Sequence, residues 1–127
     1  MRIWPFPLNN YADYMQKDLV RKLTLPQLKK YDITQKVIEA LADAESRTIL
    51  FSIIKKGRTA SELSRKYEIP LSSVYKKISD LEELTLIEVE KWLISDKGRK
   101  FKVYRSRISK ADISIKKPEP SLVLIPN

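Results

Sequence analysis

Hydroxyl groups and lysines are concentrated on and beside the polar side of a predicted helix near the middle of the chain: Ser72, Ser73, Tyr75, Lys76 and Lys77. Short donors and cations of this kind suit hydrogen bonds to base edges and phosphates in the major groove of DNA. The apolar positions of the same helix are spaced by four, three and four residues, which predicts one buried face: Val74, Ile78, Leu81 and Thr85.

A shorter helix is predicted directly before this one. Thr59 and Glu62 have the spacing of a capping box, in which side chains bind free backbone N–H groups at a helix start. The connection runs through Glu68, and a left-handed conformation at that residue would cost about 1 kcal/mol relative to glycine. Two short helices joined by a tight turn predict a helix-turn-helix, whose second helix lies in the major groove.

A strongly basic hairpin is predicted after the two helices. Residues 86–94 and 101–109 are rich in β-branched and aromatic residues, and they flank a loop that contains Gly98. The net charge of the chain is +9, and residues 91–110 hold eight basic side chains against Asp96. Such a patch favours polyanions by releasing their counterions. Seven further residues complete the predicted DNA contacts: Arg58, Thr59, Lys97, Arg99, Lys100, Lys102 and Arg105.

Helices are also predicted before the motif. One runs from Asn9 or Asn10 to about Leu23, and another from about Ile33 to Leu41. A third begins after Asp43 as N-cap and ends at residues 55–57, where Gly57 is expected to adopt the left-handed C-terminal cap.

Three regions follow from these patterns: an N-terminal arm and helical extension over 1–34, a winged helix-turn-helix domain over 35–110, and an extended tail over 111–127 that could add a strand. The predicted fold class is α+β, mainly helical with a small β-hairpin. Trp4, Phe6 and Trp92 are interpreted as anchors of the core or of a dimer. The acidic residues between 80 and 90 are expected to be solvated and to face away from DNA.

Composition limits the chemistry. The chain contains neither cysteine nor histidine, so it lacks disulfides, thiolate metal sites and the commonest general base. No catalytic constellation, metal site or cofactor motif is present, which predicts that the protein is not an enzyme. No apolar run matches a signal peptide or membrane span, and a cytoplasmic protein is expected.

ALADAESRTILFSII (40–54) and TASELSRKYEIPLSSVYKKISDLEELTLIEVEKW (59–92) resemble ArsR-type winged-helix regulators and the related archaeal TrmB-like ones. The resemblance implies a transcriptional regulator that binds double-stranded DNA as a homodimer. It also implies that the wing contacts the backbone or the minor groove. Metal sensors of that family carry cysteines where this chain has residues 61–64, so sensing by that route is excluded.

Two alternatives remain from the sequence. Winged helices also serve as protein-docking modules in transcription assemblies, although the predicted second helix exposes serine and lysine rather than apolar groups. A weakly specific chromatin protein would also carry this net charge. Sequence discrimination on duplex DNA separates a regulator from the latter.

Overall fold

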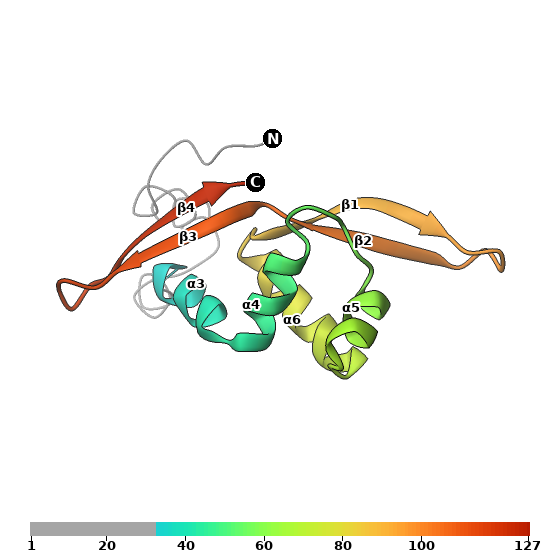
Figure 1. The fold of residues 1–127 in the computed structure, drawn as a ribbon, viewed down its shortest axis with the longest axis horizontal. Helices are drawn as coiled ribbons and strands as arrows, with labels where there is room; N and C mark the ends of the chain where they lie inside the picture. The colour runs from blue at the N-terminus through green and yellow to red at the C-terminus, as the bar shows by residue number, and fades with distance from the viewer. Residues whose placement is uncertain (1–32) are drawn as a thin grey trace, which may run out of the picture.

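The computed structural model describes residues 33–127, which form four helices followed by four strands. Their order is α3 (Ile33–Ala42), α4 (Ala44–Ser52), α5 (Ala60–Tyr67), α6 (Leu71–Glu83), β1 (Ile87–Ile94), β2 (Lys100–Ser106), β3 (Ile108–Ser114) and β4 (Ser121–Pro126). The helices lie together on one side of two antiparallel hairpins that extend in opposite directions (Figure 1). This α+β winged-helix fold confirms the predicted class. The helix predicted before Leu23 and the anchors Trp4 and Phe6 lie outside the described residues.

The four helices share one apolar core. On α3 the buried residues recur every four positions, at Ile33, Val37 and Leu41. The motif helices bury Leu63 of α5 and Val74 of α6, as the periodicity predicted. Apolar stripes of this kind remove one face of each helix from water, which is the main source of their stability. No helix within 33–127 is long and apolar enough to cross a membrane.

Local hydrogen bonds set the ends of the motif helices. Thr59 caps α5, and its hydroxyl accepts a hydrogen bond from the Glu62 N–H at 3.2 Å. Glu68 ends α5 in the left-handed conformation with φ 54°, and the Ile69 N–H donates to the Ser64 carbonyl at 3.1 Å. The tight turn is therefore built without the glycine that this conformation favours.

Thr85 was predicted to end the buried stripe of the second motif helix, and this prediction was wrong. Helix α6 stops at Glu83, and Thr85 follows it with φ 60°, outside the helix. The Leu86 N–H donates to the Leu81 carbonyl at 3.0 Å, which closes the helix end. Leu84 and Leu86 are buried on either side of Thr85, so the chain turns to place these two leucines in the core.

Gly57 does not cap α4 as predicted. The helix ends at Ser52, because the chain beyond it leaves the helix to pair with β2. The Ser106 N–H donates to the Ile53 carbonyl at 3.0 Å, and Arg58 and Tyr104 form a β-bridge. Gly57 is required for space instead: a Cβ atom there would lie 2.6 Å from Val103 Cγ1 and 2.9 Å from Glu90 Oε1.

The wing is the β1–β2 hairpin, and it confirms the predicted basic hairpin. Gly98 lies in its loop with φ 77°, the left-handed conformation expected there. A β-bulge interrupts the pairing between Val89 and Lys91. Strand β2 ends at Ser106, three residues before the predicted end, because the Ser106 hydroxyl bonds to the backbone of Ile108 at the junction with the next strand.

The C-terminal tail forms a second hairpin, β3–β4. Strand β3 already begins at Ile108, so the tail does not start at residue 111 as a separate segment. On β4 the side chains alternate: Leu122 and Leu124 are buried, whereas Val123 and Ile125 are exposed. This period of two shows that one face of the hairpin covers the helical core and the other faces away from it.

Asp43 connects α4 to α6. It caps α4 by accepting a hydrogen bond from the Ser46 N–H at 2.9 Å, and it forms an ion pair with Lys77 of α6 at 2.7 Å. The hydrogen bond from Lys77 and those from Ser46 lower the pKa of Asp43 from 3.8 to about 2. The same hydrogen bond raises the pKa of Lys77.

Substitution of Gly57 tests the close packing beside the wing. Because Val103 is buried and unable to move aside, Gly57→Ala is expected to reduce the free energy of unfolding by about 1 to 3 kcal/mol. Gly98 is the control, since nothing lies within 4 Å of a Cβ there and only its backbone conformation matters. In urea denaturation, Gly98→Asn should reduce the free energy of unfolding less than Gly98→Ala does. At position 57, the Asn variant should be as destabilised as the Ala variant. Equal tolerance at both sites would contradict the packing role.

The Asp43–Lys77 pair predicts a specific loss of stability in acid. A lowered carboxyl pKa contributes stability that is complete above its ordinary value of 3.8 and is lost as the pH falls towards about 2. The Asp43 side chain is 43% exposed, so solvent screening limits the loss to about 1 kcal/mol. Asp43→Asn keeps a capping side chain but should remove this pH dependence in urea denaturation between pH 5 and about 2. Asp96→Asn at the wing tip is the control, and an Asp43→Asn profile identical to the wild type would refute the assignment.

Candidate nucleic-acid interface

The exposed side of α6 divides into two halves of opposite charge. Lys76 lies about 200° around the helix from the buried Val74, and so points away from the core. Ser72 is exposed on the same side one turn earlier, whereas Asp80 and Glu83 follow on it towards the C-terminal end. The N-terminal half of α6 therefore presents a hydroxyl and a cation, and the C-terminal half presents carboxylates that disfavour a polyanion.

The two edges of α6 face different neighbours. Tyr75 is half exposed on the edge towards the wing, and the half-buried Ser73 lies on the edge towards α4. Lys77 lies on that second edge and is turned inward, which corrects its predicted contact with DNA. Its ammonium group is 2.7 Å from Asp43 and 3.7 Å from Glu45, and only 23% of its side chain is exposed. Two carboxylates on α4 and its cap therefore hold Lys77 for packing between helices.

A groove of about 270 Å³ separates α5 and α6 from the wing. The helices contribute hydroxyls and small groups, and the wing contributes aromatic and basic side chains: Thr59, Ala60, Ser61, Tyr75, Trp92, Lys100, Phe101, Lys102 and Tyr104. Burial raises the pKa of Tyr104 at the base of this groove. Five lining residues were not predicted as site residues, because only the packing of α5 and of the wing beside α6 brings them there: Ala60, Ser61, Trp92, Phe101 and Tyr104.

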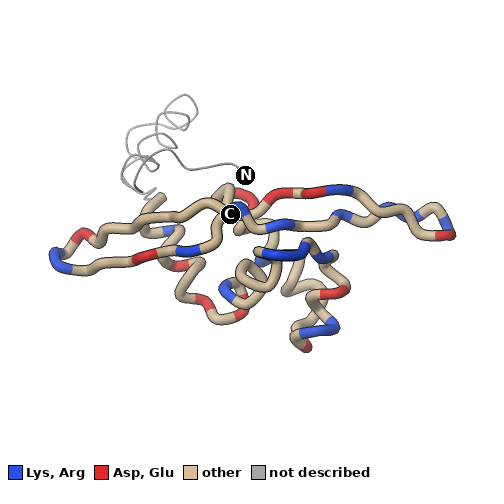
Figure 2. Tube along the Cα trace, turned by 45° about the horizontal axis from the view of Figure 1, so that its top comes forward, with Lys and Arg blue, Asp and Glu red and all other residues tan. Residues whose placement is uncertain are grey.

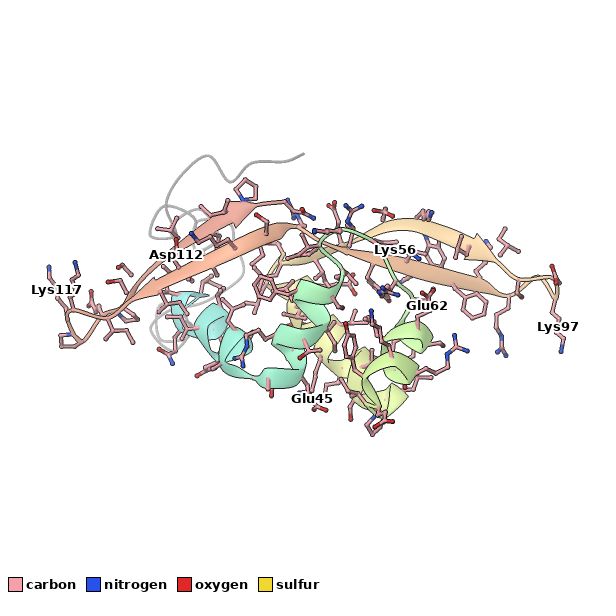
Figure 3. All side chains as sticks on the ribbon, viewed as in Figure 1. Glu45, Lys56, Glu62, Lys97, Asp112 and Lys117 are labelled. Atoms are coloured by element: carbon pink, nitrogen blue, oxygen red, sulfur yellow. The ribbon has the colours of Figure 1, made fainter. Side chains whose placement is uncertain are left out.

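The wing carries its cations at and near its tip. Lys97, Arg99, Lys100 and Lys102 are all exposed, and Lys97 projects from the far end of the hairpin (Figure 3). Blue segments recur along this arm, with red at its tip and near its base (Figure 2). Lys102 Nζ lies 5.3 Å from the centroid of the Trp92 ring, so a cation and an aromatic surface are presented together.

Three other predicted contact residues are held inside the fold. Arg105 donates to the Ile54 carbonyl at 2.9 Å and forms an ion pair with Glu90 at 2.5 Å. Arg58 is part of the β-bridge to Tyr104, and Thr59 is the buried cap of α5. Arg105 and Thr59 are bonded within the fold and the Arg58 side chain lies 3.9 Å from Glu62, so these residues add less to an exposed basic surface than was expected.

The acidic run is largely exposed, as expected, and its last two members also form ion pairs. Glu90 pairs with Arg105 at the bulge, and Glu88 lies 3.7 Å from Arg107. These carboxylates neutralise the base of the wing, whereas its tip keeps its positive charge. Trp92 is not a core anchor, because 55% of its surface is exposed on the wing.

A larger depression of about 590 Å³ lies on the opposite edge of α6, between that helix and the α3–α4 pair. Carboxylates dominate its lining, with lysines among them: Lys36, Glu39, Asp43, Glu45, Lys76, Lys77, Asp80 and Glu83. A surface with more carboxylates than cations is unsuited to nucleic acid despite its size. Within 33–127, no group of three or more His, Cys, Asp or Glu residues is arranged to hold a metal ion.

Comparison with solved structures identifies a similar fold in NolR from Sinorhizobium fredii. The TM-score is 0.50 and the sequence identity is 19%, over 66% of this chain and 78% of the NolR chain. No protein-family model matches the sequence, and no curated protein does. At this identity the likeness concerns the fold alone, and it agrees with the winged-helix-like α+β fold that the sequence predicted.

Proposed function

We propose that this protein is a transcriptional regulator that binds double-stranded DNA with sequence specificity. In this proposal the N-terminal half of α6 enters the major groove, and the wing contacts the backbone or the adjacent minor groove. The observation that carries the proposal is the groove shared by Tyr75 of α6 and Lys100 and Lys102 of β2. Two protein elements that contact successive grooves of DNA must lie on either side of the phosphate backbone between those grooves. Helix α6 and the wing lie on either side of the protein groove, which could therefore hold that backbone.

The proposed contact residues lie on α6 and the wing, and all but the half-buried Ser73 are exposed: Ser72, Ser73, Tyr75, Lys76, Lys97, Arg99, Lys100 and Lys102. Arg58, Thr59, Lys77 and Arg105 are left out because their side chains serve the fold. No side-chain hydrogen bond caps the N-terminus of α6 at Pro70. The positive end of the helix dipole there adds to the positive electrostatic potential of Lys76. The fold resembles that of NolR, which supports a regulatory rather than a catalytic role.

The proposal favours DNA over a protein partner for α6. A docking module would be expected to expose a mainly apolar face on the second motif helix. Leu71 and Tyr75 are exposed there, but the side that points away from the core carries Ser72, Lys76 and Asp80. Selection from random duplex DNA, followed by a salt titration of the selected site, tests the proposal directly. A consensus sequence and a high ratio of specific to nonspecific affinity are expected. Enrichment of no consensus would support a weakly specific chromatin protein instead.

We also propose that the protein acts as a homodimer. One recognition helix reads few base pairs, so winged-helix regulators pair two copies on a two-fold site. Within the described residues, Val123 and Ile125 are exposed on the face of the second hairpin that points away from the core. A two-stranded sheet also leaves strand edges that a second copy can pair with.

Replacing Lys76 tests the recognition face. Lys76→Ala is expected to weaken binding to the selected site by about 1 to 3 kcal/mol, while random duplexes lose less, because a base contact discriminates between sequences. Lys117→Ala is the control, since it removes the same charge from the tip of the other hairpin (Figure 3). Fluorescence anisotropy on both duplexes measures the two affinities. Equal losses on both duplexes would assign Lys76 to phosphate, and no loss would refute the assigned face.

Substitutions on β4 test the dimer. The exposed Val123 and Ile125 contribute nothing to the core, so Val123→Ser with Ile125→Ser should leave the monomer folded but weaken association at micromolar concentration. Sedimentation equilibrium should give twice the 14.8 kDa chain mass for the wild type and a lower value for this variant. Ile94→Ser on the wing is the control. A monomeric wild type that still binds a palindromic site tightly would refute the dimer.

A further inference from the structure

Three consecutive apolar side chains are exposed at the outer end of strand β1. Trp92, Leu93 and Ile94 keep 55%, 43% and 69% of their surface in water. An exposed apolar run on an edge strand carries a risk of aggregation that soluble proteins usually avoid with charges. Its presence on the wing therefore indicates contact with a partner.

The register of the wing places this run among cations. Trp92 pairs with Lys102 across the hairpin, and Ile94 pairs with Lys100. Directly paired residues of an antiparallel hairpin share one face, so these four side chains form one surface, which we call the Trp92 face. Leu93 lies on the opposite face.

The Trp92 face borders the proposed DNA interface. Trp92, Lys100 and Lys102 line the groove whose other wall includes Tyr75 of α6. A partner that occupies this groove therefore meets Trp92 on the wing and Tyr75 on the helix at the same time. Its surface must be anionic opposite the lysines and apolar opposite the tryptophan and Ile94.

A DNA minor groove has that chemistry, because phosphates line its rims and the apolar faces of stacked bases become accessible when a base step opens. We propose that Trp92 and Ile94 form an apolar wedge that enters the minor groove beside the α6 site, partly unstacks a base step and bends the duplex. Apolar side chains inserted in this way bend DNA towards the major groove. The inference rests on the proposed DNA-binding function.

An anionic membrane shares part of this chemistry, since apolar and basic side chains together also favour lipid surfaces. The duplex is the better match because the Trp92 face and the N-terminal half of α6 border one groove, and a planar bilayer does not enter a groove between two elements. Vesicle binding is therefore included as an outcome of the test.

The experiment measures bending separately from binding. A duplex containing the selected site, with a donor and an acceptor dye at its ends, should show increased energy transfer when the wild-type protein binds. Ile94→Ser and Trp92→Ser should each reduce this change by at least half at saturating protein, with an affinity loss of no more than about tenfold. Both side chains are exposed, so the fold is expected to survive, which circular dichroism verifies.

The control variant is Ile115→Ser. Ile115 is 73% exposed near the tip of the other hairpin, so it matches Ile94 in side chain and in exposure. This variant should bend DNA as the wild type does. A change in bending equal to that of Ile94→Ser would overturn the wedge and indicate a general effect of lost apolar surface.

Tryptophan emission provides a second readout. The chain has two tryptophans, so Trp4→Phe leaves Trp92 as the only one. Stacking against bases should quench its emission when the selected duplex is added.

The outcomes separate the inference from the function on which it rests. Specific binding without bending, or bending unchanged in both wedge variants, overturns the wedge and leaves DNA recognition intact. Failure of the wild type to select any duplex overturns the proposed function itself. Tighter cosedimentation with phosphatidylglycerol vesicles than with the duplex would assign the Trp92 face to membranes and also overturn the wedge.

Discussion

Backbone pairing between the segment after α4 and strand β2 is the constraint on which the rest of the structure depends. Arg58 and Tyr104 exchange hydrogen bonds of 3.1 and 2.9 Å, and Ser106 donates to Ile53. These bonds fix the wing relative to the helices. The pairing requires a residue without a side chain at position 57, where Val103 packs directly against the backbone. The orientation of the wing thus depends on one glycine far from its tip.

The two hairpins meet at this same place. The Arg107 N–H donates to the Leu86 carbonyl at 2.8 Å, and the Asn127 N–H donates to the Arg107 carbonyl at 3.0 Å. The Asn127 side chain donates to the carbonyls of Ile54 and Ser106. Hydrogen bonds with three other segments of the chain therefore satisfy the backbone polar groups of the junction. The two arms in Figure 1 project from this shared, hydrogen-bonded centre.

Charge is divided along the molecule in a way that supports the proposed interface. Glu88 and Glu90 pair with arginines at the base of the wing, and Asp43 and Glu45 hold Lys77 between helices. Paired charges create only a weak external field, because each ion is neutralised nearby. Exposed cations remain at the wing tip and on the N-terminal half of α6, the two places where the proposal puts DNA, and others lie elsewhere, such as Lys117 at the tip of the other hairpin.

The sequence by itself determined the features that arise within a few residues. Capping at Thr59, the hairpin turn at Gly98 and the buried stripe of α6 as far as Leu81 depend on local hydrogen bonds, backbone conformation and helical spacing, and all are present. Tertiary structure alone decided the partners of Lys77 and Arg105, which come from segments 34 and 51 residues away. It also decided that Gly57 fills a close contact and that Trp92 faces a groove. Composition shows that a residue is basic or small, but the register of β1 against β2 and the packing of α6 against α4 determine which neighbour it meets.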